Sequence, residues 1–297
     1  MNNITHLHIL SILSSEIRTN KNAHIKIVDM GCGDGHLLLY LQSSLSEKFS
    51  DKIIEVVGFD VSDSLVQTQH FFQNTIEFLK THSSNINWEE RLTLLNSTSK
   101  WPYEPSSIDY VISNQVFEHV WNHDFVMSQI NQVLVNEGRS FHLFPIKECF
   151  WEGHLYLPFA HWISNFDALK AYIKLCSGLG IGKYKIHKSK VPTVTLDEYS
   201  TAHADYILKY TNYKTKREFY KLAKKNDLRI SFRYTNNFYF SKLKQVLGIK
   251  QLGEYETNRT GIINTVLFFF SKRVSSSTLS LEKSNSYSIY QNQYGNL

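Results

Sequence analysis

Short apolar runs alternate with amphipathic stretches along the first half of the chain. The apolar runs predict buried strands at residues 25–30, 52–60, 91–96, 107–114 and 139–145. Apolar residues at helical spacing predict helices at residues 4–18, 36–49, 62–80 and 121–135. Near-continuous apolar strands that alternate with helices are typical of an α/β protein whose parallel sheet is covered on both faces.

This regularity ends near residue 146. Clustered aromatic residues, histidines and a glycine-rich bend follow, and they predict an inserted lid or substrate segment with a helix near 165–176. We expect a cofactor-binding core over residues 1–145, the inserted segment over 146–204, and the rest of the core sheet over 205–273. Within that last part, 214–234 is expected to form a helix and a strand, and 263–273 a last strand. Residues 274–297 are rich in Ser, Asn and Gln, and we predict that they are disordered.

Composition supports a globular protein and adds one asymmetry. Of 297 residues, 42% are hydrophobic and 14% aromatic, which is enough for a large core. Residues 183–250 hold 16 Lys or Arg against 5 Asp or Glu, which indicates either a solvated helix face or a surface for an anionic partner. Cys32, Cys149 and Cys176 are widely spaced, which is typical of reduced thiols. With no apolar run of membrane-spanning length and no signal-peptide pattern, we expect a cytoplasmic protein without a membrane span.

Three glycines lie between the first strand and the helix that follows it. Gly31, Gly33 and Gly35 permit positive φ and let a ligand approach the backbone closely. The dinucleotide pattern would place Gly or Ala at the position of His36, so the turn departs from that pattern. Asp60 ends the second strand, 29 positions after Gly31, where a carboxylate can accept both ribose hydroxyls. The alternatives are a structural tight turn and a helix N-cap.

Four segments of the chain resemble, in order, the motifs of one enzyme family. VDMGCGDG, GFDVS, WPYEPSSIDYVISNQVFEHV and VLVNEGRSFHLFP resemble class I S-adenosylmethionine-dependent methyltransferases, in the methyltransferase-domain group that includes quinone-biosynthesis enzymes. The resemblance covers about residues 25–145. It implies a Rossmann-like, doubly wound, mostly parallel seven-stranded sheet and S-adenosyl-L-methionine as cofactor.

The resemblance also implies a set of cofactor-binding residues. These are Asp29, Gly31, Cys32, Gly33, Asp60, Val61, Asn96, Ser97, Asn114 and Gln115. Asp29 and the turn would face the methionine end of the cofactor, Asp60 the ribose, and Val61 the adenine. Asn96 stands where the family often has an acid.

Two segments carry candidate catalytic residues. In VFEHV, at 116–120, His119 could take a proton from a hydroxyl acceptor, or it could anchor the loop together with Glu118. In the aromatic stretch 142–162, Glu152 and His154 could act as an orienting acid and a base, or could be buried in a closed lid. Aromatic residues there could stack on a sugar ring. No ligand spacing demands a metal bound by Glu152, His154 and His161, so we predict no metal site.

We therefore predict a methyltransferase that acts on a small molecule or a glycan at oxygen. One alternative is an RNA or protein methyltransferase that uses the basic region 183–250. Base methylation usually pairs with a proline-containing loop after the fourth strand, and residues 113–116 (SNQV) contain no proline, which disfavours nucleic acid. Another alternative is a non-catalytic protein that binds S-adenosylmethionine in a partner complex. The intact glycine turn and Asp60 disfavour it.

Overall fold

The computed structural model describes residues 3–63, 70–246 and 276–284, and its centre is a seven-stranded sheet. The strands are β1 (His24–Met30), β2 (Ile53–Val61), β3 (Leu92–Leu95), β4 (Ile108–Asn114), β5 (Leu134–Pro145), β8 (Leu228–Ser231) and β9 (Ser276–Lys283). Their order across the sheet is β3-β2-β1-β4-β5-β9-β8. Only β9 runs antiparallel to its neighbours β5 and β8. The predicted α/β fold class is confirmed.

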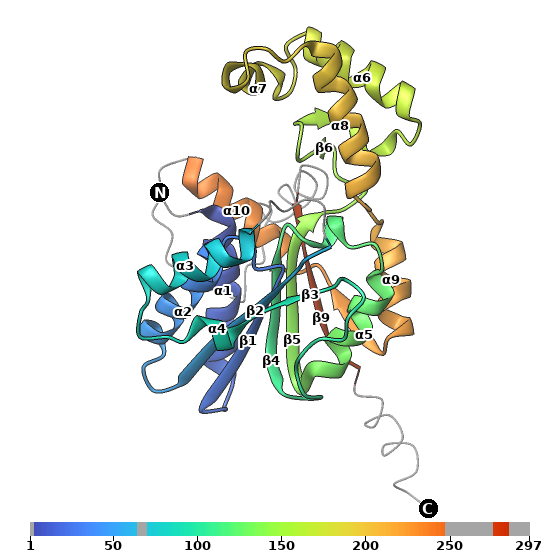
Figure 1. The fold of residues 1–297 in the computed structure, drawn as a ribbon. Helices are drawn as coiled ribbons and strands as arrows, with labels where there is room; N and C mark the ends of the chain where they lie inside the picture. Colours follow the sequence, from blue (N-terminus) through green and yellow to red (C-terminus); the bar gives the residue numbers. More distant parts are fainter. Residues whose placement is uncertain (1–2, 64–69, 247–275, 285–297) are drawn as a thin grey trace, which may run out of the picture.

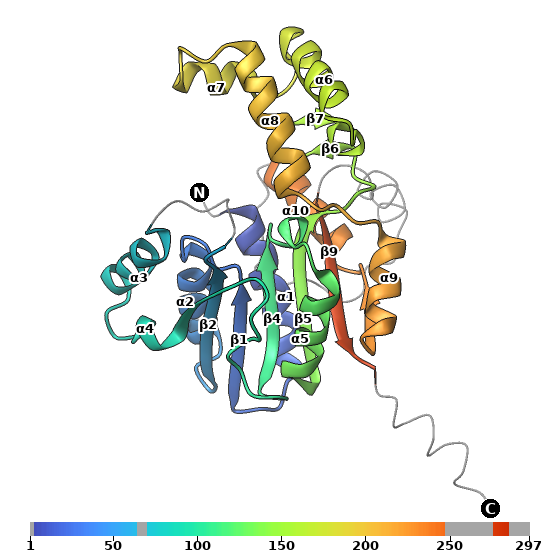
Figure 2. The ribbon, with the colours of Figure 1, turned by 45° about the vertical axis from the view of Figure 1, so that its right-hand side comes forward.

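Helices cover both faces of the sheet (Figure 1; Figure 2). Successive side chains of a strand point to opposite faces, and apolar residues at both sets of positions give each face an apolar surface to bury. In β1, Ile25 and Ile27 pack with α1 (Ile4–Thr19) and α2 (His36–Lys48) in one apolar cluster. Val28 and Met30 belong to the opposite cluster, with α5 (His123–Val133) and α9 (Lys216–Lys225). The first face also carries α3 (Phe71–His82) and α4 (Trp88–Arg91), and α10 (Thr235–Val246) packs on α1. Both faces are therefore buried.

A separate cap stands over the carboxyl ends of the parallel strands (Figure 1). We define the cap as residues 151–210. Its elements are β6 (Trp151–Glu152), β7 (Leu157–Pro158), the short helix η2 (Ala160–Trp162), α6 (Phe166–Gly178), α7 (Tyr184–Lys190) and α8 (Leu196–Tyr210). The cap has its own apolar core, in which Ile173 of α6 packs with Tyr199 and Ile207 of α8. Helix α8 thus extends past residue 204, where we expected the inserted segment to end.

The prediction that residues 274–297 are disordered is wrong for residues 276–283, which form β9. Leu279 and Leu281 are fully buried, and the neighbouring Thr278 finds polar partners inside the fold. The buried ring of His8 lies 2.7 Å from Thr278 Oγ1, and the Thr278 amide donates to Thr235. A serine-rich strand that is buried by tertiary packing resembles a linker in composition. The strand predicted at 263–273 and the tail 285–297 lie outside the described residues.

Truncating β9 in the core is expected to destabilise the whole domain. Leu281→Ala removes a fully buried side chain between β5 and β8 and should cost about 2–5 kcal/mol of unfolding free energy. Leu175→Ala is a matched control because Leu175 is 63% exposed, and it should change stability by less than about 0.5 kcal/mol. Urea unfolding measures both. Equal, small effects would contradict the placement of β9 in the sheet.

Candidate active site

The glycine turn after β1 is hydrogen-bonded to β2 on one side and faces open space on the other. The amides of Gly31 and Cys32 both donate to the carbonyl of Phe59, at 2.8 and 3.1 Å. Gly31 has φ +75°, and a Cβ there would lie 2.7 Å from a methyl group of Val116. Gly33 has φ +51°, and a Cβ there would meet nothing within 4 Å. The turn therefore presents bare backbone to open space, as a cofactor cradle requires.

Asp60 closes this cradle from the end of β2. It is only 4% exposed, and its two carboxylate oxygens accept the amide protons of Gly33 and Val61, both at 2.7 Å. Burial raises the pKa of Asp60, while the two amide donors act in the opposite direction. Each oxygen has a second lone pair, so the carboxylate can still accept the two hydroxyls of a ribose.

Asp29 is a buried carboxyl group at the end of β1. Burial raises its pKa well above the usual range, and the charges of Asp60 and Asp34 add to this shift. Its Oδ1 has no hydrogen-bond partner among the described residues. A cation in the cradle would satisfy this oxygen and favour its ionised form.

A second acid, Asp63, lies next to Ser97, in the segment where the sequence has no acid. Its two carboxylate oxygens accept hydrogen bonds from the amide and the hydroxyl of Ser97, at 2.9 and 2.7 Å. Asn96 instead accepts a hydrogen bond from the Ser62 hydroxyl, at 3.0 Å. Asp63 lies three positions after Asp60, and this spacing was the available sequence signal.

Asn114 and Gln115 end β4 but point to different partners. Asn114 Nδ2 donates to the hydroxyl of Thr5 in α1, at 3.1 Å, and its Oδ1 is buried without a partner in the described part of the chain. Gln115 has φ +59°, and its side-chain amide donates to the carbonyl of Leu143 in β5. Asn114 therefore keeps an acceptor for a ligand, whereas the Gln115 amide is bound to the sheet.

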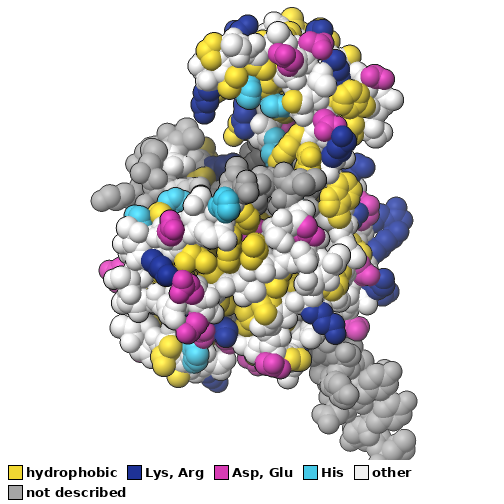
Figure 3. Space-filling model, in the orientation of Figure 1, with side chains coloured by type: hydrophobic (Ala, Val, Ile, Leu, Met, Phe, Trp, Pro, Cys, Tyr) yellow, Lys and Arg dark blue, Asp and Glu magenta, His cyan; other side chains and the backbone are white. Residues whose placement is uncertain are grey.

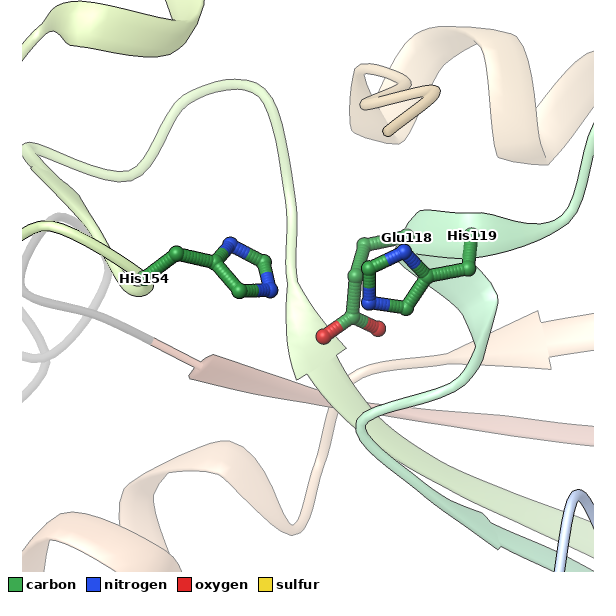
Figure 4. A group of neighbouring side chains, drawn as sticks. All are labelled: Glu118, His119 and His154. Atoms are coloured by element: carbon green, nitrogen blue, oxygen red, sulfur yellow. The ribbon is translucent and has the colours of Figure 1, made fainter. Parts of the chain in front are cut away.

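The candidate catalytic histidines meet where the cap joins the core. His119 ends the short helix η1 (Phe117–His119) after β4, and His154 lies in the turn between β6 and β7. Their ring centroids are 5.3 Å apart. With Glu118 they form a group in which one donor atom of each residue lies within 4.8 Å of the others (Figure 4). We call these three residues the seam cluster.

Glu152 fixes the ring of His154 through a hydrogen bond to its Nδ1 atom. Its side chain is fully buried, and its Oε1 accepts from His154 Nδ1 at 2.6 Å and from the Tyr213 hydroxyl at 2.9 Å. Burial raises the pKa of Glu152, but the hydrogen bonds and charge of His154 outweigh it and bring this pKa down to about 2. Burial lowers the pKa of His154, and Glu152 outweighs that effect and raises it. The tight turn between β6 and β7 makes this contact.

His119 and Glu118 complete the cluster from the core side. His119 Nδ1 lies 2.6 Å from the carbonyl of Tyr210, to which it donates, and burial lowers its pKa. His119 therefore anchors the end of α8 and leaves its Nε2 free for the cluster. Glu118 is buried, and burial raises its pKa to about 8. Its Oε2 has no hydrogen-bond partner within the described ranges.

Sequence reasoning missed the tyrosines that enclose this cluster. The ring of Tyr206 lies 5.2 Å from His154 and 6.3 Å from His119. The Tyr213 hydroxyl donates to Glu152 from the segment that leads from α8 back to the core. The backbone amide of the neighbouring Asn212 donates to the Glu118 carbonyl at 2.6 Å. These residues lie 50 or more positions away from their partners in a polar, tyrosine-rich stretch, so no local pattern marked them.

Comparison with known proteins decides the family. Residues 8–178 match the family model described as "Methyltransferase domain". The chain belongs to this family. It is an S-adenosylmethionine-dependent methyltransferase, and the resemblance in the sequence motifs is confirmed. No curated protein matches the sequence.

Several solved methyltransferase structures are similar to this chain at low sequence identity. PKMT2 from Rickettsia typhi, with AdoHcy, is 15% identical at a TM-score of 0.49, over 95% of this chain and 53% of that one. Geranyl diphosphate C-methyltransferase from Streptomyces coelicolor is 11% identical at 0.43, over 92% and 77%. Phosphoethanolamine N-methyltransferase 2 from Haemonchus contortus, with S-adenosyl-L-methionine, is 14% identical at 0.43, over 94% and 55%.

The residues of this methyltransferase fit its cofactor. The open backbone at Gly33 would admit the cofactor, and the unpartnered Asp29 oxygen would receive the ammonium of its methionine end. Asp60 would hold the ribose hydroxyls. The bound cofactor supplies a methyl group on a sulfonium, so the protein need only bring an acceptor atom in line with it.

The other charged regions of the methyltransferase show no built site. A cavity of about 260 Å³ lies between the end of α1 and strands β4, β5, β8 and β9, at the opposite edge of the sheet. Arg139, which lines this cavity, forms ion pairs with Glu16 and Glu282, so these charged side chains are satisfied by one another. Basic side chains are spread over the cap and the edge near α9, with acidic ones among them (Figure 3). In the described part of the chain, no helix is both long and apolar enough to span a membrane.

Proposed function

We propose that this methyltransferase transfers the methyl group to a hydroxyl oxygen of a small molecule or glycan bound between core and cap. One observation carries the proposal: His119 and His154 both direct a free Nε2 at the same point, beside the carboxyl end of β4. In a doubly wound sheet this is the edge at which ligands bind. A hydroxyl oxygen is a poor nucleophile until it loses its proton, whereas an amine needs no such help.

His154 is the side chain that the acceptor hydroxyl would meet. Glu152 fixes its Nδ1 proton, so the Nε2 lone pair is available to accept a hydrogen bond or a proton. Glu152 itself is fully buried and reaches no acceptor, so its role is to position His154. Because the cap provides His154 and the core provides the cofactor cradle, the acceptor would lie between them.

Aromatic side chains of the cap support a ring-shaped acceptor such as a sugar. Phe150, Phe159 and Trp162 are 37%, 37% and 51% exposed, and their rings follow one another at 4.4 and 4.6 Å. Phe150 directly precedes the cap, and exposed flat aromatic faces of this kind suit a ligand with an apolar ring face and polar edges.

An acceptor screen tests the proposal. The protein is incubated with methyl-labelled S-adenosylmethionine and, separately, with sugars and glycan precursors, phenols, RNA and protein. We expect label in hydroxyl compounds, recovered as a methyl ether by NMR of the product. Asp60→Ala is the control that should abolish all labelling. Label confined to RNA or protein, or a methyl group bonded to nitrogen or carbon, would overturn the proposal.

A further inference from the structure

The two histidines of the seam cluster are held in the same tautomer by partners behind them. His119 Nδ1 donates to the Tyr210 carbonyl and His154 Nδ1 donates to Glu152, each at 2.6 Å. Both Nε2 atoms therefore carry a lone pair when the rings are neutral. Metal-binding histidines are usually oriented in this way, with one nitrogen on the ion and the other donating to a carbonyl or a carboxylate.

The third member of the cluster is a buried carboxylate that lacks a partner. Glu118 is 2% exposed, and its Oε2 has no hydrogen-bond partner among the residues that the structure describes. A buried, unpaired carboxylate oxygen is costly, and a cation compensates for it. Its carboxylate lies beside His119 on the core side and faces His154 across the seam (Figure 4).

We propose that Glu118, His119 and His154 bind one divalent first-row transition-metal ion, and that the acceptor hydroxyl takes an open position on it. Two imidazoles and one carboxylate favour ions such as Zn²⁺ or Co²⁺ over Mg²⁺, which prefers oxygen ligands. Three protein ligands leave a coordination position open, as in catalytic sites. Metal–ligand bonds of about 2.0–2.2 Å would draw the donor atoms closer than the 4.8 Å within which they lie now.

This inference rests on the proposed function and specifies how the hydroxyl is activated. The ion lowers the pKa of the coordinated hydroxyl, whose proton leaves to solvent. The oxygen then forms its bond to the methyl carbon as the carbon–sulfur bond breaks and its electron pair stays on sulfur. The His154 lone pair holds the ion in this state, so the ion replaces the ring as the group that activates the acceptor. The site differs from our sequence expectation of no metal and excludes His161, which instead bonds the Lys147 carbonyl.

Metal titration tests the site without any acceptor. The full chain is freed of metal by chelation and titrated with Zn²⁺ by calorimetry and with Co²⁺ by visible absorption. We expect one ion per chain, a Co²⁺ spectrum typical of nitrogen ligands, and a higher thermal midpoint with Zn²⁺, because the ion binds the folded state. Glu118→Gln should weaken binding more than about tenfold, and Glu152→Gln, behind a ligand, by about 10–100-fold. His161→Gln, a cap histidine outside the cluster, should bind as the wild type does.

Circular dichroism of the metal-free variants separates ligand loss from misfolding. A folded Glu118→Gln or His119→Gln protein that binds Zn²⁺ as tightly as the wild type would overturn the metal site. So would the absence of binding in the wild type. If the metal-free protein still methylates hydroxyls at full rate, the metal site is wrong and the proposed function stands. If the ion binds at the cluster and hydroxyls are never methylated, the proposed function is wrong and the binding site stands.

Discussion

Replacing His154 with alanine is expected to lower the turnover number by about 10²–10⁴-fold and to leave the affinity for S-adenosylmethionine nearly unchanged. His154 belongs to the cap and is held by Glu152, whereas the cofactor cradle lies at the ends of β1 and β2. The loss follows in either case, whether the Nε2 lone pair takes the proton of the acceptor or holds an ion that lowers the pKa of the acceptor hydroxyl. Initial rates with the acceptor found by the screen, together with calorimetric titration of the cofactor, measure the two effects.

Two comparisons separate a chemical role of His154 from a structural one. Added imidazole should partly restore the rate of His154→Ala, because it can fill the space of the lost ring. His187→Asn removes another cap histidine, whose ring contacts Tyr199 and His203, and should retain full activity. If His154→Ala is fully active, or if it loses cofactor binding along with turnover, His154 does not contact the acceptor.

Replacing Asp60 with alanine is expected to weaken the binding of S-adenosylmethionine by about 100-fold or more. Hydrogen bonds to a charged group contribute about 1.5–3 kcal/mol each, and two ribose hydroxyls would lose their acceptor. The Gly33 amide would also lose the carboxylate that now fixes it at 2.7 Å. Calorimetry with the cofactor and with its demethylated product measures the change.

Asp109 offers a matched control for this substitution. It is as buried as Asp60, at 5% against 4% exposure, and it likewise accepts a backbone amide proton, from Lys26. It lies at the start of β4, at the far edge of the sheet. Asp109→Ala should therefore lower the stability and spare cofactor affinity. Similar losses of affinity in both variants would mean that Asp60 acts only by stabilising the fold.

Local patterns were sufficient for the parallel half of the sheet. Strands such as β1 and β4 are buried on both faces over most of their length and have apolar centres, so each is recognised without its neighbours. The glycine turn was equally clear, because positive φ at Gly31 and Gly33 restricts the choice of residue. Strand β9 was missed because it is rich in serine and its burial depends on distant segments, such as α1, whose His8 contacts Thr278.

The sequence by itself determined the fold class and the methyl donor and predicted the residues of its cradle, because these depend on strand periodicity and on short, ordered motifs. Only the tertiary structure brought His154 from the cap against Glu118 and His119 of the core, across more than 30 positions of intervening chain. It also decided that Asp63 lies next to Ser97 and that Glu152 positions a ring instead of meeting an acceptor. Contacts between distant segments depend on how the cap packs over the sheet, and that packing leaves no periodic trace in the sequence.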